Sequence, residues 1–123
     1  MSEHTCEVVV VHCMDSRLQK PINDWLQRRF GLSDYDRISL AGGVFELDFI
    51  LKQVEISYRR HKIRKAILVN HENCSAYGED NTPERHAVDL RKAEARIKVE
   101  IPQLDVELYF LHLTGIFERI PSG

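Results

Sequence analysis

The chain alternates between short apolar runs and longer stretches in which apolar positions recur every three or four residues. The runs at 7–12 and 65–69 are mostly apolar and rich in branched side chains, which is typical of parallel strands covered on both faces. Further strands are predicted at 35–40 and 106–111, and a short edge strand at 116–120. The pattern therefore predicts four main strands separated by helical stretches.

Three helices are predicted between these strands. Pro21 suits the first position of a helix and Gly31 suits a helix end, so the first helix lies between them. A second helix covers 47–58, where apolar residues keep helical spacing. A third begins at the cap and proline of Thr82–Pro83 and runs to about Glu100.

The alternation of strands and helices predicts an α/β fold, organised as a single three-layer domain over residues 1–123. A chain of this length fits one core and is too short for two. Its sheet is expected to be mostly parallel and four-stranded, in the order second, first, third and fourth strand, with the short edge strand in addition.

Two thiols and one imidazole stand at the ends of two predicted strands. Cys13 follows the first strand, and His71 and Cys74 follow the third. Ligands of open α/β sheets collect at the carboxyl ends of strands, where the strand order reverses. Three protein ligands leave zinc a fourth position for water or substrate, as in catalytic sites. The sequence therefore predicts a catalytic zinc centre, although iron or cobalt could occupy the same donor set.

Asp15 and Arg17 lie close to the first thiol in the sequence. Asp15, two residues beyond Cys13, could accept a hydrogen bond from a water on the metal. The planar Arg17 guanidinium could grip this carboxylate through two hydrogen bonds and keep it ionised. Alternatively, Asp15 is a helix cap and Arg17 a solvated charge.

Four segments resemble those of β-class carbonic anhydrases and occur in the same order. They are the Cys-x-Asp-Ser-Arg segment at 13–17, the Ala-Gly-Gly turn at 41–43, the His-x-x-Cys segment at 71–74 and the Leu-Thr-Gly-Ile segment at 113–116. The match runs from Val8 to Ile120. The first and third segments together, on a strand–helix–strand background, are specific, whereas the turn alone would be a weak signal.

This resemblance implies that Cys13, His71 and Cys74 hold zinc beside the Asp15–Arg17 pair, and that the chain reversibly hydrates carbon dioxide to bicarbonate. Zinc acidifies its bound water, and the resulting hydroxide attacks carbon dioxide. Two thiolates donate more electron density than two imidazoles, so activity is expected to rise toward alkaline pH. In some members the aspartate binds the fourth zinc position in an inactive state, and either state is open here. The substrate-pocket candidates are the residues of the turn, Ala41, Gly42 and Gly43.

Three features depart from the pattern of that family. Ser75 stands where glycine is common, and Ser39–Leu40 replaces the usual Arg-Asn before the glycine turn, which makes the expected pocket more apolar. The chain also starts almost at the first strand, without the N-terminal helices that embrace a partner in members whose active sites lie at a dimer interface. We expect a homodimer that covers apolar helix positions.

Three other function classes stay open. A related hydrolase could use the same zinc chemistry on carbon disulfide or carbonyl sulfide. A non-catalytic domain could keep the ligands without turnover. Thiol redox chemistry is less attractive, because neither Cys13 nor Cys74 belongs to a Cys-x-x-Cys pair.

Composition and charge exclude other partners. A formal net charge of -2 gives no electrostatic case for nucleic acid or for an anionic membrane. The apolar run near the N-terminus is too short for a signal peptide or a membrane span, so a cytoplasmic location is the default expectation. Three cysteines are too few for a disulfide scaffold, and Cys6 is expected to be a small buried residue without a role. The remaining histidines are expected to be surface or packing residues: His4, His12, His61, His86 and His112.

Overall fold

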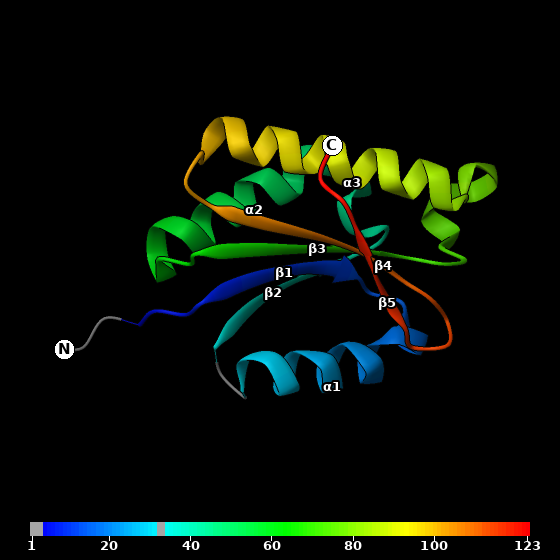
Figure 1. Ribbon diagram of the computed structural model, residues 1–123, viewed down its shortest axis with the longest axis horizontal. Coiled ribbons are helices and arrows are strands. Elements are labelled where there is room, and N and C mark those ends of the chain that lie inside the picture. Colours follow the sequence, from blue (N-terminus) through cyan, green and yellow to red (C-terminus); the bar gives the residue numbers. More distant parts are fainter. Residues whose placement is uncertain (1–3, 32–33) are drawn as a thin grey trace.

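The computed structural model describes residues 4–31 and 34–123, and it arranges them around one five-stranded sheet (Figure 1). The strand order is β2-β1-β3-β4-β5, with the first four strands parallel and β5 antiparallel to β4. The predicted order and the short edge strand are therefore confirmed. The strands are β1 (Val8–Cys13), β2 (Tyr35–Leu40), β3 (Lys65–His71), β4 (Asp105–Leu111) and β5 (Phe117–Ile120).

Helices cover both faces of the sheet, which gives the expected three layers. Helix α1 (Gln19–Phe30) lies on one face, and α2 (Leu47–His61) and α3 (Pro83–Glu100) lie together on the other (Figure 1). None of the helices in the described ranges is long and apolar enough to cross a membrane.

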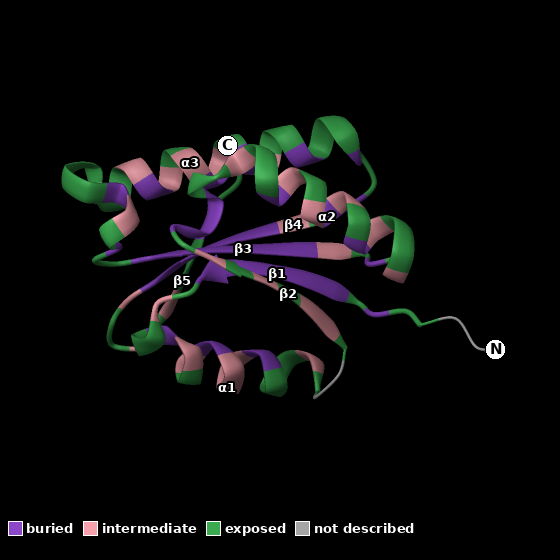
Figure 2. Cartoon of the chain, turned by 180° about the vertical axis from the view of Figure 1, so that it is seen from behind, coloured by how far each residue is buried: buried purple, intermediate pink, exposed green. Residues whose placement is uncertain are grey.

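The two apolar cores explain why the central strands are mostly apolar. Val8 and Val10 pack on the α1 side of the sheet, whereas Val9 and Val11 pack on the side of α2 and α3. All four are fully buried. Figure 2 shows the central strands as buried, whereas the helices carry both buried and exposed residues. Burial on both faces therefore leaves only the strand ends for polar chemistry.

Two element boundaries differ from the sequence prediction in ways that matter for the site. Helix α1 begins at Gln19, so Pro21 lies within its first turn and not at its first position. Proline is tolerated there because amides of the first turn have no partner within the helix. Strand β3 continues past Val69 through His71, so this histidine ends the strand and does not follow it.

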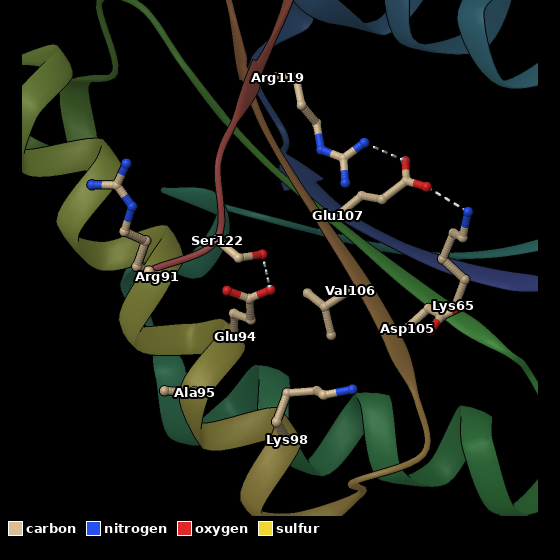
Figure 3. Close-up of a pocket in the computed structure, with 11 residues that line it drawn as sticks. Lys65, Arg91, Glu94, Ala95, Lys98, Asp105, Val106, Glu107, Arg119 and Ser122 are labelled. Carbon is tan, nitrogen blue, oxygen red and sulfur yellow. Dashed lines mark hydrogen bonds and ion pairs between the residues drawn. The ribbon is translucent and has the colours of Figure 1, made fainter.

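A separate hollow of about 730 Å³ lies between α3, β4 and β5 (Figure 3). Glu107 on β4 is its buried carboxylate, paired with Lys65 and with Arg119 at 3.8 Å. Arg29 and the Tyr109 hydroxyl also donate to Glu107, at 3.1 and 2.7 Å. Burial opposes ionisation, but the hydrogen bonds from Lys65 and Arg29 outweigh it and lower the pKa of Glu107 from 4.5 to about 2. Through these contacts Glu107 links β4 to Lys65 on β3, to Arg119 on β5 and to Arg29 on α1.

Glu107→Gln is expected to destabilise the fold at neutral pH by about 1 to 3 kcal/mol, because it leaves partly buried cations without their anion. Since the folded pKa is depressed, the contribution of Glu107 is complete above pH 4.5 and is lost as the pH falls toward 2. Urea unfolding at several pH values should therefore show a weaker acid dependence in the variant. Glu100→Gln at the exposed end of α3 is the control, and equal acid dependence in wild type and Glu107→Gln would refute this role.

Candidate metal centre

Cys13, His71 and Cys74 converge at the carboxyl ends of β1 and β3. Cys13 and His71 are the last residues of their strands, and Cys74 precedes a short 3-10 segment, Ser75–Asp80. The two sulfurs and one imidazole nitrogen all lie within 4.8 Å of one another, and all three residues are buried. The group could hold a metal ion.

The orientation of the His71 ring suits a metal ligand. Its Nδ1 lies 2.6 Å from the carbonyl oxygen of Glu72. A carbonyl only accepts, so Nδ1 carries the proton and Nε2 keeps its lone pair. Among the residues that the structure describes, this Nε2 is the buried side-chain nitrogen or oxygen without a hydrogen-bond partner. Buried polar atoms are rarely left unsatisfied, and a metal ligand whose other nitrogen donates to a carbonyl is a common reason.

The two thiols differ in acidity. Burial raises the pKa of Cys13, but hydrogen bonds with the His71 imidazole and the Gly42 amide outweigh this effect. The pKa of Cys13 is therefore lowered to about 7. The Gly42 N–H lies 3.4 Å from the Cys13 sulfur. Burial, together with the nearby Cys13, raises the pKa of Cys74. One thiolate is thus available near neutral pH, and a bound cation would displace the second proton. Two sulfurs and one nitrogen suit a borderline-soft ion such as zinc.

Asp15 and Arg17 form the predicted pair beside this group. The Arg17 side chain donates from Nε and Nη2 to both carboxylate oxygens of Asp15, the shortest contact being 2.6 Å. Asp15 Oδ2 lies 4.0 Å from His71 Nε2. The Arg17 hydrogen bonds lower the pKa of Asp15 to about 2, so it is a carboxylate at all physiological pH values. Asp15 therefore lies beside the candidate metal ligands as an anion held by Arg17.

Asp15 also caps the 3-10 turn Ser16–Leu18, because its Oδ1 accepts the Arg17 backbone N–H at 2.9 Å. The alternative interpretation, a cap, is thus geometrically present as well. The same carboxylate thus caps the turn and pairs with the Arg17 side chain. Only a substitution that keeps the cap and removes the charge can distinguish the two roles.

Asn73 holds Arg17 from the other side, and sequence reasoning missed it. The Arg17 guanidinium donates to the Asn73 side-chain oxygen at 3.2 Å and to its carbonyl at 3.1 Å. Asn73 adopts a left-handed backbone with φ 60°, which asparagine tolerates better than most residues. The sequence feature that could have pointed to Asn73 is its position between His71 and Cys74 in the His-x-x-Cys segment.

The glycine turn contacts the candidate ligands through its backbone, because the Gly42 N–H donates to the Cys13 sulfur. Ala41 is exposed, whereas Gly42 and Gly43 are buried. A Cβ on Gly43 would lie 2.4 Å from the Asn70 side-chain oxygen, and its φ of 60° also disfavours other residues. The three pocket candidates thus divide into one exposed residue, one amide donor to Cys13 and one closely packed glycine.

Asn70 is a second residue that the sequence reasoning did not identify. Its side-chain oxygen accepts the Val44 N–H at 3.1 Å, and its amide lies 2.8 Å from the Tyr77 hydroxyl and 2.9 Å from His86 Nδ1. Tyr77 in turn donates to Asp89 at 2.9 Å. This buried network ties the glycine turn to the segment that follows Cys74. The sequence feature that could have pointed to Asn70 is its polar side chain directly after the apolar run 65–69.

Comparison with known proteins identifies the family. A family model described as "putative carbonic anhydrase" matches residues 3–120, nearly the whole chain. An uncharacterized protein of Rickettsia conorii is 32% identical over 132 aligned positions, which cover 91% of this chain and 70% of that protein.

Two solved structures show the same fold at low sequence identity. A β-carbonic anhydrase of Trichomonas vaginalis superposes with a TM-score of 0.73 at 15% identity, covering 100% of this chain and 88% of that chain. A carbon disulfide hydrolase superposes with a TM-score of 0.60 at 15% identity, covering 96% of this chain and 80% of that chain. At these identities the likeness establishes the fold alone. Together with the family model, it means that the chain belongs to this carbonic anhydrase family, as a divergent member with the β-class fold.

Proposed function

We propose that this protein is a zinc enzyme that reversibly hydrates carbon dioxide to bicarbonate. The observation that carries the proposal is the buried, unpartnered Nε2 of His71, within 4.8 Å of two cysteine sulfurs. Membership of a carbonic anhydrase family supports the same activity. Cys13, His71 and Cys74 would hold the ion, which would acidify water and so supply a nucleophile.

Asp15 would orient the reacting water. Because its pKa of about 2 keeps it ionised, it can accept a hydrogen bond and has no proton to donate. Arg17 fixes the direction of the carboxylate through its bidentate contact, and Asn73 fixes Arg17. A carboxylate bound in this way is also less free to bind the ion itself.

A hydrolase of carbon disulfide or carbonyl sulfide is the second candidate. A solved carbon disulfide hydrolase has the same fold, which shows that this fold can carry that reaction. The same donors would serve either reaction, so access of the substrate to the site would decide between them. A zinc-binding domain without turnover is the non-enzymatic alternative.

Assays of the zinc-loaded protein on all three substrates across a range of pH test this proposal. We expect carbon dioxide hydration whose rate rises from acid to alkaline pH, because two thiolates offset the charge of the ion more than imidazoles do. Turnover of carbon disulfide or carbonyl sulfide alone would favour the second candidate. A carbon dioxide rate that is flat across pH would contradict the proposed chemistry.

We further propose a homodimer in the cytoplasm. Met14, directly after Cys13, is 59% exposed, and Phe45 and Phe49, just after the glycine turn, are 42% and 51% exposed. Apolar side chains exposed near a proposed site favour cover by a second copy. The molar mass in solution tests the dimer, and a monomer at all concentrations would refute it.

A further inference from the structure

A second group of metal-ligating side chains lies at the opposite end of the sheet from Cys13. It consists of His4, which precedes β1, Asp36 near the start of β2, and His61, the last residue of α2. One ring nitrogen from each histidine and a carboxylate oxygen all lie within 4.8 Å of one another. The start of the described chain, the start of β2 and the end of α2 lie at the same end of the molecule (Figure 1). Three distant segments thus bring two imidazoles and one carboxylate together.

The Asp36 carboxylate is held in position by α2. Ser57 and His61 are one helical turn apart, and both contact its Oδ2, each at 2.6 Å. Burial opposes ionisation of Asp36, but these hydrogen bonds outweigh it and keep its pKa below the ordinary value. Asp36 is therefore an oriented anion.

His4 is brought to the same place by the backbone. The Cys6 N–H donates to the His61 carbonyl at 3.0 Å, which fastens the segment before β1 to the end of α2. The rings of His4 and His61 then meet edge to face, with centroids 4.3 Å apart. His4 is exposed and His61 is partly buried, so solvent reaches the group.

The donor set suits a divalent first-row transition ion. Imidazole nitrogens favour zinc, copper and nickel, and a carboxylate completes a three-ligand set with open positions for water. Tetrahedral zinc needs donor atoms about 3.3 Å apart, a small adjustment from the present spacing that the exposed His4 can supply. Asp36 and His61 line a hollow of about 200 Å³ with room for water, although two arginines of the same hollow, Arg37 and Arg60, oppose a cation and limit the affinity.

We propose that His4, Asp36 and His61 form a second metal site, for a divalent transition ion such as zinc. The site shares no residue with the proposed catalytic centre and stands whether or not that centre is active. Because its ligands come from three segments, a bound ion clamps the chain start and β2 onto α2. Binding to the folded state alone also raises the unfolding temperature.

Zinc titration by calorimetry tests the second site in a protein whose first site has been removed. Cys13→Ser/Cys74→Ser supplies that background without touching the second group. We expect one zinc-binding event to remain there. Adding His4→Ala or His61→Gln should lower the zinc affinity of this event by at least about 10- to 100-fold. Loss of a residue that only hydrogen-bonds to a ligand already costs that much affinity.

His112→Ala in the same background is the matched control, because this histidine pairs with Glu118 and belongs to neither group. It should leave the remaining event unchanged. His4 lies on an exposed segment before the first strand, so its replacement spares the core and keeps the test interpretable. No zinc binding in the double-serine background would overturn the proposal, as would binding that neither His4→Ala nor His61→Gln weakens.

Discussion

Cys74→Ser is expected to lose tightly bound zinc and to reduce carbon dioxide hydration to the rate of buffer. The substitution replaces one sulfur by oxygen and keeps the shape of the side chain, so the buried turn should keep its backbone. A serine hydroxyl is a poor zinc ligand, because it does not ionise as a thiol does. Replacing a residue that only hydrogen-bonds to a metal ligand typically lowers the metal affinity by about 10- to 100-fold, and loss of a ligand itself should lower it further. Zinc retained after gel filtration with a chelator measures it.

Cys6→Ser is the matched control for this experiment. Cys6 is also buried, at 6% exposure, but it lies outside the donor group of Cys13, His71 and Cys74. The control should keep zinc at that group and keep activity. Equal zinc retention and equal turnover in Cys74→Ser and wild type would exclude Cys74 as a ligand.

Asp15→Asn should keep zinc but lower carbon dioxide hydration by about 10²- to 10⁴-fold, the usual contribution of a group that handles the reacting proton. Asparagine caps helices as well as aspartate does, so the hydrogen bond from the Arg17 amide can persist. The negative charge and the bidentate contact with Arg17 are lost. The variant thus separates the charge of Asp15 from its role as a cap.

Asp24→Asn supplies the same chemical change away from the site, since Asp24 pairs with Lys20 on the surface of α1. Its activity should equal that of wild type. Zinc content should be the same in wild type, Asp15→Asn and Asp24→Asn. Asp15 pairs with Arg17 and does not belong to the proposed donor group of Cys13, His71 and Cys74. Full activity in Asp15→Asn would reduce Asp15 to a structural cap.

The parallel sheet could be predicted from sequence because the central strands are buried on both faces, whereas its strand order is inferred from the expectation that ligands collect where the order reverses. Val8–Val11 is covered on both sides, as is typical of a parallel sheet between helix layers. That arrangement also places Cys13 and His71 at one edge of the sheet. The fold and the convergence of the three ligands therefore follow from apolar pattern and topology.

The supporting residues could not be predicted in the same way. Asn70 and His71 are polar, so the apolar run seemed to end at Val69, although both belong to the strand and are buried. Their burial depends on partners such as Tyr77 and the Val44 amide, which only the folded chain brings close. The contact of Asn73 with Arg17 likewise joins residues 56 positions apart.

The second group shows the same limit of sequence reasoning. His4 and His61 were expected to be surface or packing residues, since nothing in their local sequence distinguishes them. Asp36 lies on an edge strand, where a charged residue is ordinary. Their proximity arises from the backbone hydrogen bond between Cys6 and His61 and from the packing of α2, which are tertiary features.

Stopped-flow hydration of carbon dioxide, followed while zinc is titrated into metal-free protein, tests the central claim most directly. The proposal predicts that the rate rises above buffer as zinc fills the site of Cys13, His71 and Cys74, and that Cys74→Ser stays at the buffer rate throughout. Tight zinc binding at that site without any rise in the hydration rate would contradict a carbonic anhydrase.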